Sequence, residues 1–212
     1  DPKIFWVEQE QCYWMLVATN EKTDNSVCRH GCVGLCKSKD LYHWEYCPPL
    51  YSPLAYDGTY ECPDMFQMGE WYYLIYSNAN VNKRTHYVKS KGMYGPWQMP
   101  EDDTLDSFLF YAGRTASDGE NRYLVAWNPE RTGEDLAMKL GVRDVDQPPL
   151  RQYEDLAPFG YAGDMVMHRL GQKENGDLMV MMIPSFREPF VQEVPFVFQS
   201  LQGEKWTVRE QG

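Results

Sequence analysis

The chain has 212 residues, of which 43% are hydrophobic and 15% aromatic, and its formal net charge is −11. This composition is typical of a packed globular protein and excludes a disordered chain. The negative charge repels phosphates and anionic lipids, so we expect neither a nucleic-acid nor a membrane partner. The longest apolar runs, such as residues 178–183, are far shorter than the roughly 18 residues of a spanning helix.

Short strands repeat along the chain. Residues 1–19 and 62–77 both run from a proline through two residues to a phenylalanine, then through a polar turn into an aromatic-rich strand. Weaker openings, each written Tyr-Ala-Gly, begin at Tyr111 and Tyr161. Repeats therefore start near residues 1, 61, 111 and 161, a period of about 50 to 60 residues, and none contains a convincing helical pattern. Such repeats are typical of the blades of a β-propeller.

Three complete units are too few to close a propeller, which uses about four to eight blades. We therefore predict an all-β chain that forms about three blades or more over residues 1–185 and is an interior piece of a larger protein. Residues 186–212 change character, and we expect them to be a linker and the first strands of another sheet. Edges left open by such a piece could associate with a second copy.

All six cysteines fall in the first 62 residues. Cys28, Cys32 and Cys36 share one parity, so on a strand they would line one face as small buried side chains. With His30 nearby, a zinc site is the alternative, but the usual pair of cysteines two residues apart is missing. We expect buried free thiols and no metal. Free thiols slightly favour a cytoplasmic location over a secreted one, which stays open.

Two carboxylates stand beside the prolines that open the first two repeats. Asp1 precedes Pro2, and Glu61 precedes Pro63 by two residues at the lip of an apolar strand. Because the innermost strands of propeller blades begin around one central cavity, Asp1 and Glu61 are expected at the rim of the same cavity. Paired carboxylates around a sugar-sized pocket are what cleavage of a glycosidic bond requires. The alternative is that Glu61 belongs to an ordinary turn.

The segment ECPDMF, residues 61–66, resembles the E-C-P-D-L-F motif of glycoside hydrolase family 32, the β-fructosidases. DPKIFW at residues 1–6 resembles that family's R-D-P-K-V-F motif without its arginine, and residues 38–45, 110–129 and 161–170 resemble its later blades in order. The resemblance implies a five-bladed propeller followed by a β-sandwich. It also implies retaining hydrolysis of terminal β-fructosides such as sucrose, inulin or levan, with no cofactor.

Carried over residue by residue, the resemblance makes Glu61 the general acid/base and Asp1 the residue that stabilises the transition state. Asp64 is expected to support Glu61, and candidate substrate-binding residues are Cys62, Asp64, Tyr111 and Trp127. The family's nucleophile lies in an upstream W-x-N-D-P-N-G motif that nothing in this chain matches. We therefore expect this chain alone to be inactive and the protein that contains it to be active.

Two other functions stay open: an arabinan- or xylan-cleaving glycosidase of family 43, which shares the propeller, and a propeller that binds carbohydrate or serves assembly without catalysis. The other polar segments favour structural roles. His43 is expected in a solvated turn and His86 on a strand, while the acidic residues 101–106 miss the spacing of a calcium loop. Residues 143–155 are expected to form a loop between blades.

Overall fold

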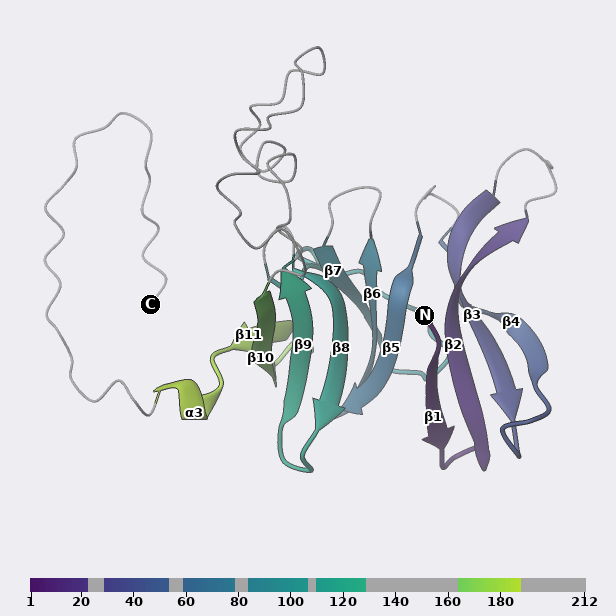
Figure 1. Cartoon of the computed structure of the whole chain (residues 1–212), viewed down its shortest axis with the longest axis horizontal. Coiled ribbons are helices and arrows are strands. Elements are labelled where there is room, and N and C mark those ends of the chain that lie inside the picture. The colour runs from purple at the N-terminus through teal and green to yellow at the C-terminus, as the bar shows by residue number, and fades with distance from the viewer. Residues whose placement is uncertain (23–28, 54–58, 79–83, 107–109, 129–163, 188–212) are drawn as a thin grey trace, which may run out of the picture. The chain divides into compact units, whose positions relative to one another are not determined.

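The computed structural model describes residues 1–22, 29–53, 59–78, 84–106, 110–128 and 164–187 (Figure 1). The chain divides into two units, Asp1–Met182 and Ile183–Gly212. Within the described part of the second unit lies the short helix α3, Pro184–Arg187. The strands expected beyond it, the predicted β-sandwich and the predicted loop at residues 143–155 fall outside the described residues.

In the described part of the first unit, the strands form three antiparallel sheets. The first sheet has the order β1-β2-β3-β4, the second β5-β6-β7, and the third β8-β9-β10-β11. Their bounds are Lys3–Val7 (β1), Cys12–Lys22 (β2), Arg29–Ser38 (β3), Glu45–Tyr51 (β4), Glu61–Met68 (β5), Trp71–Asn78 (β6), Arg84–Ser90 (β7), Tyr111–Ser117 (β8), Arg122–Asn128 (β9), Asp164–Gln172 (β10) and Leu178–Met181 (β11).

The third sheet corrects the spacing of the repeats. The sheets open at Lys3, Glu61 and Tyr111, but the opening expected near residue 161 leads into β10, which pairs with β9. β10 and β11 therefore complete the sheet that β8 begins, and no separate sheet starts near residue 161 in the described part of the chain. In the sequence, the first Tyr-Ala-Gly segment opens β8 and the second directly precedes β10, and both of these strands belong to one sheet.

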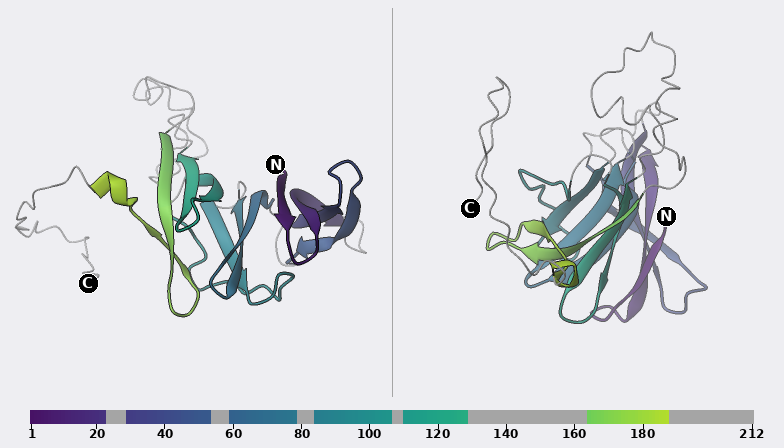
Figure 2. Two further views of the ribbon diagram at one scale, coloured as in Figure 1. Left: turned by 90° about the horizontal axis from the view of Figure 1, so that it is seen from below. Right: turned by 60° about the vertical axis from the view of Figure 1, so that its left-hand side comes forward.

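The second sheet packs on both of its faces, between the other two sheets (Figures 1 and 2). On β6, Leu74 and Tyr76 contact the first sheet, whereas Tyr73 and Ile75 contact the third. Alternate residues of a strand point to opposite faces, so a strand buried on both faces reads as a continuous apolar run. This explains the unbroken aromatic and aliphatic sequence of β6.

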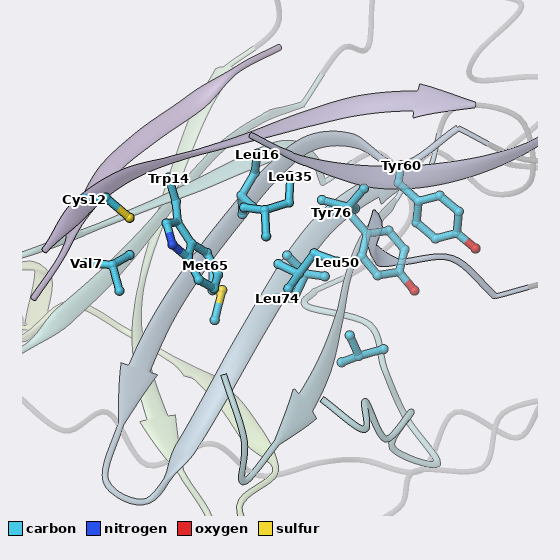
Figure 3. Packing of buried hydrophobic residues seen from close by; sticks show 12 residues of the cluster. Val7, Cys12, Trp14, Leu16, Leu35, Leu50, Tyr60, Met65, Leu74 and Tyr76 are labelled. Carbon is cyan, nitrogen blue, oxygen red and sulfur yellow. The ribbon is translucent and has the colours of Figure 1, made fainter. Parts of the chain in front are cut away.

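The core between the first and second sheets is built around Trp14 and Leu16, both fully buried on β2 (Figure 3). Met65 and Leu74 reach this cluster from the second sheet. The core between the second and third sheets contains Phe66, Tyr73, Tyr87, Leu124 and Leu170. These two cores hold the innermost strands β1, β5 and β8 side by side, so that their openings can share a site.

Two cysteines of the predicted buried group, Cys32 and Cys36, lie in the described part of the chain. Cys32 and Cys36 are buried on β3, and the five cysteines in the described part of the chain are free. Burial raises the pKa of both thiols, which keeps them protonated and unreactive. Among the described residues no group of three His, Cys, Asp or Glu side chains could hold a metal ion. Cys28 lies outside the described residues.

The histidines and the acidic segment also have structural roles. His43 lies in an exposed turn beside Asp40, and His86 lies on β7, where its Nδ1 is 3.1 Å from Asp103 Oδ2. Asp106 contacts His168 in the third sheet, at 2.6 Å. These carboxylates of residues 101–106 therefore join neighbouring segments. No helix in the described part of the chain is long and apolar enough to cross a membrane.

Candidate active site

Glu61 lies at the opening of β5, where the ladder with β6 is irregular. The register shifts between Glu61 and Asp64, and Cys62 has a φ of 50°. A residue in this left-handed region turns the chain sharply, and a bulge of this kind redirects the side chains beside it. Glu61 is half-buried, and its Oε1 accepts a hydrogen bond of 3.2 Å from Thr59 Oγ1.

β8 opens with the same backbone irregularity. Its register shifts between Tyr111 and Arg114, and Ala112 has a φ of 57°. The Tyr111 hydroxyl donates a hydrogen bond to Glu61 Oε2. Burial raises the pKa of the Tyr111 phenol, and the carboxylate of Glu61 reinforces the shift, so the hydroxyl remains a donor. The two bulges thus place a carboxylate and a phenol from neighbouring sheets in contact.

Asp1 lies beside the same bulge of β5. Its Oδ2 accepts a hydrogen bond of 3.1 Å from the backbone N–H of Cys62, the residue after Glu61. Cys62, the residue with the left-handed φ, thus supplies the backbone N–H that binds the Asp1 carboxylate. Burial raises the pKa of the Cys62 thiol, which therefore stays neutral.

Arg114 links the three strand openings, and sequence reasoning missed it. Its Nη1 donates to the carbonyl oxygen of Pro63 at 2.9 Å, and its Nη2 donates to that of Asp1 at 3.2 Å. One guanidinium from β8 thus holds the backbone beside both acids. Its position, three residues after Tyr111, matches the position of Asp64 after Glu61. The equal spacing is visible in the sequence, but only the two matching bulges show that Arg114 and Asp64 occupy equivalent positions.

The other predicted residues divide into two groups. Trp127 on β9 lies directly opposite Tyr111 in the ladder and is half-buried, so it stays a candidate sugar contact. Asp64 does not reach the surface, since only 1% of its side chain is exposed. A carboxylate this buried has no face for a sugar. This burial counts against the predicted contact of Asp64 with substrate, and its predicted support of Glu61 stays a prediction.

A cleft in the described residues lies elsewhere. It has a volume of about 540 Å³ and is lined by residues of the turns that follow β1 and β3, such as Glu10 and Trp44, and by residues at the ends of the adjoining strands, such as Lys37 on β3. These turns lie at the opposite end of β1 from Asp1. Glu10 is engaged inside the protein, since its Oε2 is 2.7 Å from Lys37 Nζ and 3.0 Å from Trp14 Nε1. Neither of the predicted catalytic acids, Asp1 and Glu61, lines this cleft.

Three antiparallel sheets that pack face to face are typical of the blades of a β-propeller, and a pair of acids is what glycosidic cleavage requires. The sequence profile of the glycosyl hydrolases family 32 N-terminal domain matches residues 1–139. The chain belongs to glycoside hydrolase family 32, and this membership decides against the family 43 alternative.

Among its relatives, the chain is 26% identical to the sucrose-6-phosphate hydrolase of Vibrio alginolyticus, over 92% of this chain and 39% of that protein. It is 27% identical to the levanbiose-producing levanase of Bacillus subtilis strain 168, over 69% of this chain and 30% of that protein. The chain thus spans about two fifths of the first relative and less of the second.

The fold is similar to that of the family 32 β-fructofuranosidase of Bombyx mori. That structure matches with a TM-score of 0.61 and 20% identity, covering 89% of this chain and 38% of that one. The prediction of an all-β propeller fold is therefore confirmed. The number of blades in the whole protein stays a prediction.

Proposed function

We propose that the protein containing this chain hydrolyses terminal β-fructosides, such as sucrose or oligosaccharides of the inulin or levan type. The observation that carries the proposal is that Glu61 and Asp1 are held beside one bulge. The Tyr111 hydroxyl donates a hydrogen bond to Glu61, and the backbone N–H of Cys62, the residue after Glu61, donates one to Asp1. Family membership and the names of the relatives support fructosides as the substrate class.

In the proposed reaction, Glu61 is the general acid that protonates the glycosidic oxygen as the bond breaks. A separate carboxylate attacks the anomeric carbon, and Glu61 then accepts a proton from the water that releases fructose. Asp1 hydrogen-bonds the hydroxyls of the fructosyl ring as positive charge develops on it. The attacking carboxylate has no match in this chain, so we propose that another segment of the protein supplies it.

The decisive experiment measures fructose release from sucrose and from an inulin trisaccharide by the protein at its natural length. Glu61→Gln should lower kcat by about 100- to 10,000-fold, because the leaving oxygen loses its proton donor. Glu120→Gln, a matched change in an exposed turn, should have no effect.

A β-fructoside with an acidic phenol as leaving group sharpens the assignment. Such a leaving group departs without protonation, so Glu61→Gln should lose far less activity in the first step on this substrate than on sucrose. An equal loss on both substrates would contradict the acid role of Glu61. If the natural-length protein binds sucrose but releases no fructose, it is a carbohydrate-binding propeller rather than an enzyme.

A further inference from the structure

Glu61 and Tyr111 open two different sheets, and Asp1 lies two residues before β1 of the third. Strands within one sheet are fixed by their ladder of hydrogen bonds, but no ladder joins β1, β5 and β8 to one another. Their relative positions therefore depend on side chains that cross between the sheets. Catalytic geometry is sensitive to this, since a displacement of about 1 Å can cost about 100-fold in rate.

Asp64 makes such a crossing. Its Oδ2 accepts two hydrogen bonds from Thr115 on β8, one from the backbone N–H at 2.6 Å and one from Oγ1 at 2.9 Å. Its Oδ1 lies 3.3 Å from the Nζ of Lys3 on β1. One buried carboxylate on β5 thus binds both neighbouring innermost strands. Removing one partner of a buried charge is costly, which makes this arrangement hard to distort.

Arg122 on β9 completes the arrangement, which we call the Asp64 cluster: Lys3, Asp64, Thr115 and Arg122. Its Nη1 donates to Thr115 Oγ1 at 2.9 Å, so the Thr115 hydroxyl is directed to donate its own proton to Asp64. The guanidinium also lies over the ring of Phe66 on β5, 4.4 Å from its centroid. Arg122 therefore fixes the orientation of Thr115.

The Asp64 cluster lies a short distance along each strand from the site. Lys3 is two residues from Asp1, Asp64 is three from Glu61, and Thr115 is four from Tyr111. A strand advances about 3.3 Å per residue, so each link acts within roughly 7–13 Å of the residue it would position. A change of spacing in the cluster therefore has to pass along only two to four residues of each segment to reach the site.

We propose that Asp64 is a positioning residue, whose buried carboxylate sets the spacing of β1, β5 and β8 and through it the relative placement of Asp1, Glu61 and Tyr111. The consequence for catalysis rests on the proposed function, but the spacing itself does not. Loss of the cluster should therefore alter turnover more than sugar binding, and should alter the contact between Tyr111 and Glu61 even in the absence of substrate.

The test compares three variants: Asp64→Asn, which removes the charge, Thr115→Val, which removes the hydroxyl, and Val33→Ala as a control. Val33 is fully buried on β3 and belongs to none of the three innermost strands. Val33→Ala should lower the unfolding temperature without touching the Asp64 cluster. Kinetics on sucrose are measured with the natural-length protein, well below the unfolding temperature of each variant.

Asp64→Asn should lower kcat by about 10- to 100-fold, with KM changed by less than about threefold. Thr115→Val should show a smaller loss of the same kind, and Val33→Ala should keep kcat. If Asp64→Asn and Val33→Ala lose stability together and both keep kcat, Asp64 is only a stabilising residue and the proposal is wrong.

A second readout does not depend on activity. The NMR signal of the Tyr111 ring carbon bonded to the hydroxyl, in protein labelled at tyrosine and assigned with Tyr111→Phe, reports the contact with Glu61. It should shift in Asp64→Asn and stay unchanged in Val33→Ala. An unchanged signal in Asp64→Asn would overturn the proposal. A shifted signal in a protein that cleaves no fructoside would leave the positioning role in place and refute the proposed function.

Discussion

The openings of β5 and β8 have the same backbone conformation but carry different side chains. In each strand the register shifts across the same interval, Glu61 to Asp64 and Tyr111 to Arg114, and the second residue has a left-handed φ. The first residues contact each other, since Tyr111 donates to Glu61. The fourth residues cross in opposite directions: Asp64 binds the β8 strand, whereas Arg114 reaches back to the β5 bulge.

The same bulge has a different role at the opening of each strand. On β5 the bulge presents an acid and a backbone N–H to the site. On β8 it presents the phenol that binds this acid and the guanidinium that holds the neighbouring backbone. The backbone repeat sets where the side chains point, and the residue types decide what each bulge does. Substitutions at the third, first and second residues of the bulges separate these two contributions.

The largest effect on stability is expected at the third residue of the bulge, which is Pro63 on β5 and Gly113 on β8. A Cβ on Gly113 would lie 2.7 Å from Cγ2 and 3.0 Å from Oγ1 of Thr85, a fully buried residue of the second sheet. Gly113→Ala should therefore lower the free energy of unfolding by about 1–3 kcal/mol, measured by urea denaturation. Pro63→Ala, the matched change, should cost less than about 1 kcal/mol. Equal losses would show that the two bulges are packed alike.

A smaller loss of stability is expected when the contact between Tyr111 and Glu61, the first residues of the two bulges, is removed. Tyr111→Phe removes the donor to Glu61 and should cost about 1–2 kcal/mol, in the range for hydrogen bonds to charged groups. Because folding raises the pKa of this phenol, its contribution to stability is complete below about pH 10, the pKa of an unfolded tyrosine, and is lost as the pH rises further. The free energies of unfolding of the wild type and of Tyr111→Phe should therefore converge as the pH rises above 10. A difference in the free energy of unfolding that stays constant as the pH rises would show that the Tyr111 hydroxyl does not stabilise the fold through this hydrogen bond.

The smallest effect is expected at the left-handed residues themselves. Glycine adopts this φ without strain, so Ala112→Gly should raise the free energy of unfolding by up to about 1 kcal/mol. Cys62→Gly should gain less, because the half-buried thiol loses its packing. Thermal unfolding of both variants measures the difference. A loss of stability above about 1 kcal/mol in Ala112→Gly would mean that its backbone is not strained.

Much of this arrangement could be predicted from the sequence. The apolar run of β6 predicts a strand, and the prolines and phenylalanines shared by residues 1–19 and 62–77 predict repeated sheets. Motif resemblance selects Glu61 and Asp1. The Asp64 cluster could not be predicted, because Lys3, Asp64 and Thr115 are far apart in the chain and each is an ordinary polar residue of its own strand.

The sequence by itself determined the all-β class, the openings near residues 1, 61 and 111, and the choice of Asp1 and Glu61 as candidate acids, because alternation, turn residues and short motifs are local properties. Only the tertiary structure decided that β10 joins the sheet of β8, that Asp64 is buried, and that Arg114 spans two sheets. These facts depend on which strands pack together. Packing is set by the fit of whole faces rather than by any one segment.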